Sequence, residues 1–591
     1  MLSRFFGLIL IAYFLLAGLY ASVTPVFEKP DENWHFAVAM YVLETGQLPQ
    51  NIDDTPDHLS RHQAHQPPLY YLTVATVLRI LNFDNLTIGY LHLSEQNSQY
   101  RSDTPILVSD NRRVFIQGHC IDECLRTRNA VFVGRSLSII YVGVGILFAG
   151  MAVNLIFPDD TALVYLTSAL IAFNPQVLHI ASSVSNDSLT ILLMNIGFFL
   201  LALWLKGKRN YQIIVFMALV AGLALITKLS AGSLGLVMGL LILIGASSRL
   251  KSISLFALIS LSISAWWFIY NTILYTDPTA LALHIRLAPQ QSAPDTFWGI
   301  IVQLPTVMRS FWMEFGWGQL VLPSSYYTLF FVLVAVSLSS CLVAILRSWK
   351  KMPAYQQEFL IASLAIIALV FILLLRWMSM TQAPHGRLLF PAIFPLSLLL
   401  SLGILGFFRK RWQLKGVYGF VSMLIMSAIF LAVFFVYPAY IAPKPFTAPE
   451  LEEPQIIFRE DTGGEIHLLD IAMTNDNDAL YVQMSWQLET RLQDDYLVFV
   501  HALNADGVIV SQRDSYSGLS NMPFSRLDAG EIFHDIYVLM PANEDIEFLR
   551  IGIYRAGDLP NTWQRLDAES SLLAIEDNAV LIPRSALRII E

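Results

Sequence analysis

Long apolar runs dominate the first three quarters of the chain. A helix needs about 20 mostly apolar residues to cross a bilayer, and eleven runs approach that length. They lie near residues 5–24, 134–157, 160–177, 187–205, 211–228, 230–247, 252–273, 325–346, 357–376, 388–407 and 416–438. The pattern therefore predicts a membrane all-α bundle of about 11 transmembrane helices.

After Tyr437 the apolar residues follow a different period. Between Leu480 and Leu488 they alternate with polar neighbours, which is the pattern of a half-buried strand. Four more short strand candidates follow, separated by turn signals, at residues 496–503, 508–512, 532–540 and 548–554. We therefore expect a transmembrane domain over residues 1–440 and an all-β sandwich domain over residues 441–591.

Two of the connections between the expected spans are long, at residues 24–133 and 272–324. The first contains the apolar stretch 67–83, which is short for a span, and we expect it to lie in the membrane interface. The second is rich in Pro and Trp, and a short surface helix is expected over residues 297–311. Long loops beside a rigid bundle are where a site is commonly built.

Composition and charge support a membrane location and give an orientation. The chain has 55% hydrophobic and only 14% charged residues, with a mean hydropathy of +0.54. Basic residues gather in short loops that fall on one side if the helices alternate, and that side is expected to be cytoplasmic. The N-terminus is then cytoplasmic and the β-sandwich extracytoplasmic. We expect the first helix to stay uncleaved, with cleavage after Ala21 as the less favoured alternative.

The densest polar cluster follows the first helix and contains Asp31, Glu32 and His35. If a helix begins here, Asp31 and His35 lie one turn apart on a shared face, with Glu32 beside them. A carboxylate near an imidazole at a membrane surface is a candidate general base. An acidic helix cap followed by a solvated loop explains the same residues equally well.

Two further polar clusters have simpler explanations. His65 precedes Gln66-Pro67-Pro68 and two tyrosines, which favours a helix begun by proline with an aromatic belt. Asn186 and Asp187 precede the expected span at 187–205, and either residue suits the N-cap of that helix. A binding role for these clusters would be additional to those structural roles.

Cations on the expected outer side run against the usual charge bias of membrane proteins. They are Arg135, Lys228, and the pair His385 and Arg387. A single one of them would commonly snorkel to the headgroups. Several on one face would form an anion site, and a lipid phosphate is then the natural ligand.

Cysteine is scarce, with Cys120 and Cys124 in the first long loop and Cys341 in a span. Three cysteines are too few for a disulfide scaffold or a four-thiolate zinc site. His119 beside the loop pair is weak support for a metal. We expect Cys120 and Cys124 to form a small disulfide or to be free thiols.

The order of these motifs resembles a known group of proteins. It runs from Pro30-Asp31-Glu32-Asn-Trp-His35-Phe36 through His65-Gln-Pro-Pro-Leu-Tyr-Tyr, Asn-Pro, Ser-Asn-Asp and Thr-Lys-Leu-Ser to Gly-Arg-Leu-Leu-Phe-Pro. The set is similar to an uncharacterised bacterial family of polytopic membrane proteins, which itself resembles the GT-C glycosyltransferases such as protein O-mannosyltransferases and aminoarabinose transferases. The resemblance covers about residues 1–440.

The resemblance implies a transferase that takes a sugar from a polyprenyl-phosphate donor at the outer face of the bacterial plasma (inner) membrane. The catalytic acid of such enzymes maps onto Asp31, with Glu32 in support, and the phosphate contacts map onto Lys228 and Arg387. No cofactor is implied, although some relatives use a divalent cation, which Asp31, Glu32 and Asp187 could hold. The acceptor would be a glycan, a lipid or a protein.

Two other function classes remain open at this stage. A flippase or transporter of lipid-linked sugars would carry ionisable residues at mid-depth of its helices, whereas the polar groups here gather at the outer ends. A non-catalytic envelope assembly protein would bind glycans through its β-sandwich. Nothing in the sequence indicates a nucleic-acid partner.

Overall fold

The computed structural model describes residues 4–50, 60, 63–100, 113–117, 122–287, 296–381, 383–442, 444, 456–476, 479–492, 494–540, 546–555 and 564–589. This part of the chain forms two compact units. The first contains residues 1–25, 29–86 and 126–435, and the second contains residues 26–28, 87–125 and 436–591. The second unit therefore includes part of the first long loop, which the predicted boundary at residue 440 assigned to the transmembrane domain.

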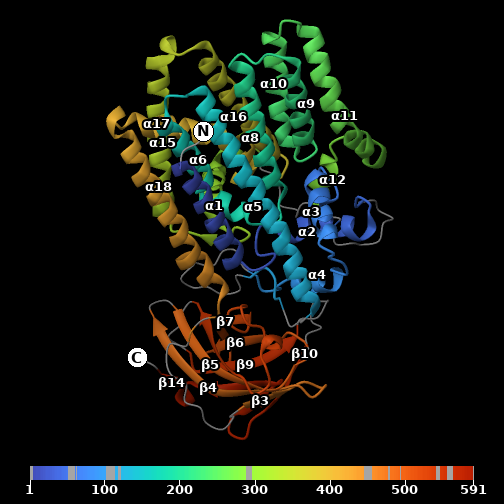
Figure 1. Cartoon of the computed structure of the whole chain (residues 1–591). Helices are drawn as coiled ribbons and strands as arrows, with labels where there is room; N and C mark the ends of the chain where they lie inside the picture. Colours follow the sequence, from blue (N-terminus) through green and yellow to red (C-terminus); the bar gives the residue numbers. More distant parts are fainter. Residues whose placement is uncertain are drawn as a thin grey trace. The chain divides into compact units, whose positions relative to one another are not determined.

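The first unit is helical (Figure 1). Its long helices are α1 (Arg4–Val23), α5 (Asp122–Ile156), α8 (Asn186–Leu205), α11 (Arg249–Tyr275), α15 (Ser324–Ser348), α16 (Ala354–Met378), α17 (Ile393–Gly406) and α18 (Gln413–Phe430). Its shorter helices are α2 (Glu32–Thr45), α3 (Leu69–Ile80), α6 (Thr161–Ala172), α7 (Pro175–Ala181), α9 (Tyr211–Leu225), α10 (Gly232–Gly245), α12 (Leu281–Leu287), α13 (Phe297–Val302) and α14 (Leu304–Trp312).

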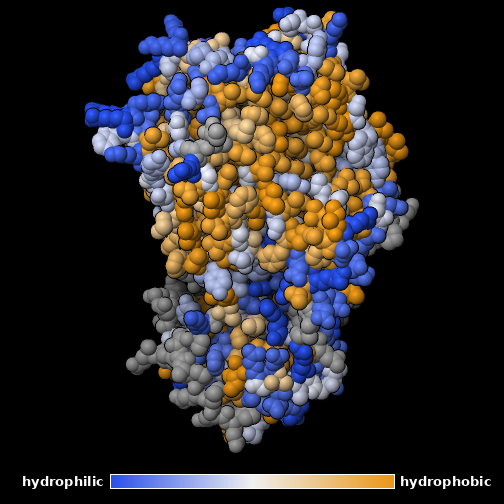
Figure 2. Space-filling model, in the orientation of Figure 1, coloured by the Kyte–Doolittle hydropathy of each residue, from blue (hydrophilic) through white to orange (hydrophobic). Residues whose placement is uncertain are grey.

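Within the described residues, eight helices are long and apolar enough to cross a membrane. They make the chain a multi-pass membrane protein, and Figure 2 shows the broad hydrophobic face that they present. The expected spans at 211–228 and 230–247 correspond to shorter helices, and the one at 160–177 is a bent pair. The predicted count of about 11 is therefore not confirmed. The stretch 67–83 forms α3, whose 12 residues are too few to span.

The bent pair, α6 and α7, turns by 57° at Asn174-Pro175. Proline has no backbone N–H and disfavours helix at the residue before it, so the helix ends there. The Asn174 side chain then caps α7 by accepting hydrogen bonds from the backbone N–H groups of Gln176 (2.8 Å) and Val177 (3.1 Å). The bend leads the chain through Ser182–Ser185 into α8, which carries Asn186 and Asp187 in its first turn.

Side-chain packing between the helices follows the apolar stripes. Helix α9 packs on α8, α10 and α11, and α17 packs on α6 and α15 (Figure 1). Between α14 and α15 the chain forms a hairpin of β1 (Glu314–Phe315) and β2 (Leu320–Val321). Before α17 it forms the 3-10 turn η4 (Gly386–Ala392), which packs on α14 and α16.

The second unit contains the predicted β-sandwich. One sheet has the order β12-β13-β9-β6-β7 and the other β11-β3-β4-β5-β8, with β10 and β14 added to β9 and β4. The strands are β3 (Ile456–Arg459), β4 (Glu465–Asp476), β5 (Ala479–Thr490), β6 (Leu497–Leu503), β7 (Ile509–Tyr516), β8 (Ile532–Leu539), β9 (Phe548–Arg555), β10 (Gln564–Arg565), β11 (Asp567–Glu569), β12 (Ala574–Glu576), β13 (Ala579–Pro583) and β14 (Arg588–Ile589).

Alternating side chains of both sheets form the core of this sandwich, as their period of two requires. Val482 and Trp486 of β5 pack in one cluster with Val500 of β6 and Ile551 of β9. All five strands expected from the sequence are present, whereas β3, β4 and the strands after Arg555 were not predicted. Helix α4 (Thr87–Leu93) belongs to the same unit.

The long loop joins this unit through buried polar contacts. Glu28 accepts hydrogen bonds from the backbone N–H groups of Val114 and Phe115, both at 3.1 Å. Arg113 donates to the side chain of Asn521 at 2.8 Å. Cys124 is disulfide-bonded and Cys341 is free, while Cys120 and His119 lie outside the described residues.

Candidate functional site

A cavity of about 450 Å³ lies within the helical unit, where the ends of several helices and their connections converge. It is lined by polar and aromatic side chains that are far apart in the sequence: Pro30, Asp31, Trp34, His35, Gln63, His65, Gln66, Gln176, Asn186, Asp187, Lys228, Ser310, Glu314, Trp317, Gly318, Trp377, Thr381, Ala383, Pro384, His385, Gly386, Arg387 and Leu388. Its size is within the range of ordinary ligand sites.

Asp31 and Arg387 form an ion pair at this cavity although 356 positions separate them. Asp31 lies at the N-cap position of α2 with φ +60°, and its side chain makes no capping bond. Burial alone would raise the pKa of Asp31, but the charges of Arg387 and His35 lower that pKa to about 2. The carboxylate is therefore ionised at neutral pH and is held by a cation instead of by the helix.

Arg387 is placed by the close packing of the residue before it. A Cβ at Gly386 would lie within 3.0 Å of the backbone N of Phe311 and the carbonyl O of Val307, so only glycine allows η4 to approach α14 this closely. The backbone N–H of Gly386 also donates to Ser310 Oγ at 2.7 Å. Side chains of any size at position 386 would push Arg387 away from Asp31.

A second ion pair joins Asp187 and Lys228, with Nζ 2.5 Å from Oδ1. Ser185, and neither Asn186 nor Asp187, is the N-cap of α8, because Ser185 Oγ accepts from the Asp187 backbone N–H at 3.3 Å. The predicted capping role of Asn186 and Asp187 is therefore wrong. Both residues instead lie in the first helical turn and line the cavity.

Three histidines also line the cavity, at positions 35, 65 and 385. His35 Nδ1 is 2.8 Å from the hydroxyl of Tyr71. Burial lowers the pKa of His35 to about 4, against the opposing charge of Asp31. Arg387, Asp187 and Lys228 also act on this pKa, so His35 lies within the field of both ion pairs. At neutral pH its ring is neutral.

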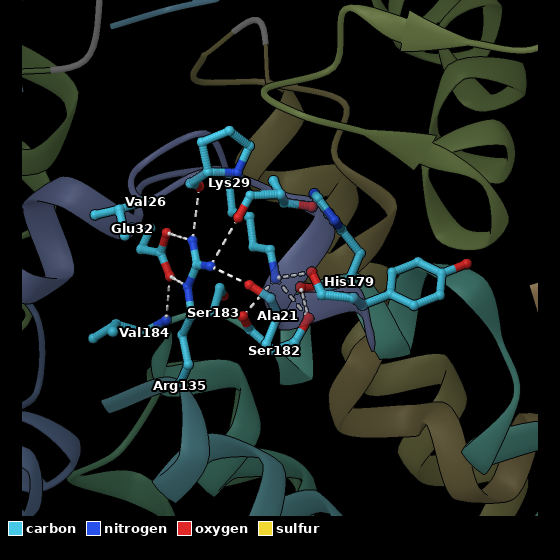
Figure 3. A network of polar contacts seen from close by, with 12 residues as sticks. Ala21, Val26, Lys29, Glu32, Arg135, His179, Ser182, Ser183 and Val184 are labelled. Carbon is cyan, nitrogen blue, oxygen red and sulfur yellow. Dashed lines mark hydrogen bonds and ion pairs between the residues drawn. The ribbon is translucent and has the colours of Figure 1, made fainter. Parts of the chain in front are cut away.

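Arg135 and Glu32 lie in a buried polar network of their own (Figure 3). Both side chains have an exposed fraction of 0%, and neither is among the residues that line the cavity. Arg135 uses all five N–H donors, two on Glu32 and three on the carbonyls of Ala21, Thr24 and Pro25. In this structure Arg135 and Glu32 thus bind each other away from the cavity lining. The predicted roles of Arg135 in substrate binding and of Glu32 in catalysis stay predictions.

Lys29 belongs to the same network (Figure 3). Its Nζ donates to the carbonyl of Tyr20 (3.1 Å) and to the carbonyl and hydroxyl of Ser182 (2.5 and 2.6 Å). Burial lowers the pKa of Lys29, as does the nearby charge of Arg135. Glu32 also accepts from the Val184 backbone N–H at 3.0 Å. These contacts tie the loop that carries Asp31 to the loop that leads to Asp187.

A third carboxylate lines the cavity, that of Glu314 on β1, and it was not among the predicted site residues. Its Oε2 accepts from Arg309 Nε at 3.0 Å, and its backbone N–H donates to Gln176 Oε1 at 2.9 Å. Burial raises the pKa of Glu314, although Arg309 opposes this. The short run Glu314-Phe-Gly-Trp317-Gly, an acid before two glycines, was the signal available within the long loop 272–324.

The charged groups of the cavity bear on which ligand it could hold. Among the described residues, no group of three or more His, Cys, Asp or Glu side chains is arranged to hold a metal. Of the three acids considered for a divalent cation, Glu32 is occupied by Arg135. Arg387 and Lys228, in contrast, both face the cavity and carry the charge that a phosphate group requires.

Comparison with known proteins finds structural likeness at low identity. ArnT from Cupriavidus metallidurans bound to undecaprenyl phosphate is 12% identical with a TM-score of 0.41, over 73% of this chain and 72% of that one. The Archaeoglobus fulgidus oligosaccharyltransferase in complex with zinc and sulfate is 14% identical with a TM-score of 0.38, over 73% and 52%. The Saccharomyces cerevisiae protein O-mannosyltransferase Pmt1-Pmt2 complex bound to the sugar donor is 13% identical with a TM-score of 0.29, over 49% and 34%.

All three structures are glycosyltransferases of the GT-C class that the motifs resemble. No protein-family model matches the chain, and no curated protein matches it. Because the likeness to solved structures is distant, the function is inferred from the residues of the cavity.

Proposed function

We propose that the chain is an inverting membrane glycosyltransferase. It transfers a sugar from a polyprenyl-phosphate donor to an acceptor hydroxyl at the outer face of the bacterial inner membrane. The observation that carries the proposal is one cavity lined by the carboxylate of Asp31 and by the cations Arg387 and Lys228. A base and a phosphate-binding pair within reach of each other are what this transfer needs.

Arg387 and Lys228 hold the donor phosphate. Each is now paired with a carboxylate, so a phosphate that enters the cavity competes with Asp31 and Asp187 for them. Arg387 offers a planar fork of N–H groups that matches two phosphate oxygens, and Lys228 adds a point charge. Both side chains are largely shielded from water, with exposed fractions of 13% and 14%, which strengthens their interaction with a charged ligand.

Asp31 is the general base. The charge of Arg387 helps to hold the pKa of Asp31 at about 2, so the carboxylate is a weak base before a donor phosphate binds. Once the donor phosphate engages Arg387, the carboxylate loses part of that stabilisation, its pKa rises, and it becomes a better proton acceptor. Donor binding and activation of the base are thus coupled through a single guanidinium group.

In the transfer step, Asp31 accepts the proton of the acceptor hydroxyl as its oxygen attacks the anomeric carbon of the sugar. The bond between that carbon and the phosphate oxygen breaks, and the electron pair stays on the departing polyprenyl phosphate. Arg387 and Lys228 stabilise the negative charge that grows there. A single displacement of this kind inverts the anomeric configuration.

The proposal is tested with the purified full-length chain and a panel of polyprenyl-phosphate sugars. Release of polyprenyl phosphate marks a transferase, and Asp31→Asn should lower its rate by about 10² to 10⁴ fold because the proton acceptor is lost. Asp160→Asn is the matched control, since Asp160 pairs with Lys410 (2.8 Å), does not line the cavity and keeps a good N-cap as asparagine.

Two results would contradict the proposal. Turnover by Asp31→Asn near the normal rate would remove Asp31 as the base. Binding of every panel member without release of polyprenyl phosphate would favour a transporter or a glycan-binding protein instead.

A further inference from the structure

The hairpin between α14 and α15 brings an acid and an indole ring to the cavity. Glu314 and Trp317 both line it, and so does Trp34 of α2. The proposed transfer step uses none of these three side chains. Their chemistry differs from that of the phosphate-binding end, because they combine one carboxylate with two large aromatic faces.

Glu314 is arranged to accept hydrogen bonds from a ligand. One carboxylate oxygen, Oε2, is bound by Arg309 at 3.0 Å. The other, Oε1, has no hydrogen-bond partner among the described residues and lies beside the α-carbon of Gly318, where a Cβ would come within 2.9 Å. Any side chain at position 318 would therefore crowd this oxygen, and the φ of Gly318, +108°, also disfavours one.

The two indole rings lie together in the cavity lining. Trp34 and Trp317 meet edge to face, with ring centroids 5.2 Å apart. Trp34 follows Asp31 by three residues, so it lies about one helical turn from the carboxylate that pairs with Arg387. A group bound on these rings would be a near neighbour of a phosphate held by Arg387.

We propose that Glu314, Trp34 and Trp317 form the subsite for the sugar ring of the lipid-phosphate donor. This inference rests on the proposed function. A sugar ring has an apolar face, which packs on indole, and an edge of hydroxyl groups, which donate to a carboxylate. Since the sugar is bonded directly to the phosphate, its ring must lie beside the cations that hold the phosphate, and these three residues line the same cavity as those cations.

The subsite is tested by comparing two ligands in the full-length protein. One is undecaprenyl phosphate, and the other is undecaprenyl phosphate linked to glucose, mannose or N-acetylglucosamine. The measured quantity is the ratio of their affinities, taken for the sugar that binds best. Glu314→Gln should lower this ratio about tenfold or more, because a hydrogen bond to a charged acceptor is lost. Trp317→Phe should lower it about threefold.

Neither substitution should change the affinity for undecaprenyl phosphate itself by more than about twofold, since neither residue holds the phosphate. Trp312→Phe serves as the control, because it trims a buried indole outside the cavity lining. It should leave the ratio unchanged.

Several results would overturn the subsite. They are an unchanged ratio in Glu314→Gln, an equal loss in Trp312→Phe, or a panel in which no sugar improves on the bare lipid phosphate. In each of these cases, Arg387-dependent binding of undecaprenyl phosphate would leave the proposed function standing. If undecaprenyl phosphate does not bind, or binds independently of Arg387, the proposed function and the subsite fail together.

Discussion

The buried pair of Arg135 and Glu32 allows a sharp test of what holds the loop before α2. Arg135→Met removes a guanidinium that makes five hydrogen bonds and is 0% exposed. It leaves the Glu32 carboxylate buried with the Val184 N–H as its remaining donor in this network (3.0 Å). Removing one partner of a buried pair costs about 3–5 kcal/mol, and the three unpaired carbonyls add to that cost.

This loss is a large part of the 5–15 kcal/mol that usually separates folded from unfolded protein. Glu32→Gln should cost about 3 kcal/mol, because Arg135 keeps its three carbonyl partners but loses its counter-charge. The double variant should lose less stability than the sum of the two single variants, since neither Arg135 nor Glu32 is then left buried without its partner. We expect a coupling free energy of about 2–3 kcal/mol.

The assay is denaturant unfolding of the detergent-solubilised protein, followed for the wild type, both single variants and the double variant. The reference is the exposed pair of Arg126 and Asp84, whose side chains are 45% and 67% exposed. A double-mutant cycle of Arg126→Gln and Asp84→Asn should give a coupling free energy below about 1 kcal/mol. Equal coupling in the two cycles would refute the claim that burial makes the Arg135 pair strong.

Three further predictions follow from the cavity. Gly386→Ala should cost about 1–3 kcal/mol or more and weaken donor binding, measured by unfolding and by undecaprenyl phosphate affinity, whereas Gly419→Ala, with no atom within 4 Å of the added Cβ, should be nearly neutral. Because the pKa of His35 is lowered from 6.5 to about 4, the unfolded state binds more protons below pH 6.5. Stability should therefore fall by about 3 kcal/mol as the pH drops from 6.5 to 4, and His35→Gln should flatten that part of the profile. Arg387→Lys should keep part of the phosphate affinity and Arg387→Gln should lose most of it, so equal affinities would argue against a charge-assisted contact.

The local pattern of residues determined the class of the fold. The apolar runs became helices, and the alternating residues of the last 150 became strands, because both periods are properties of the chain itself. The proline at position 175, which ends α6, is a local signal of the same kind. Apolar length alone did not fix the helix lengths, because the expected spans at 211–228 and 230–247 form helices shorter than a span requires.

Side-chain partners were decided by the tertiary structure alone. The sequence indicated acids after the first helix and cations at the ends of later ones, but the charges of Arg135 and Arg387 look alike in a sequence. Packing buried the first against Glu32 and turned the second toward Asp31, 356 positions away. Glu314 reached the same cavity through a hairpin that no periodicity predicted. The physical reason is that a charge takes its role from its burial and its counter-charge, and both depend on contacts between distant segments.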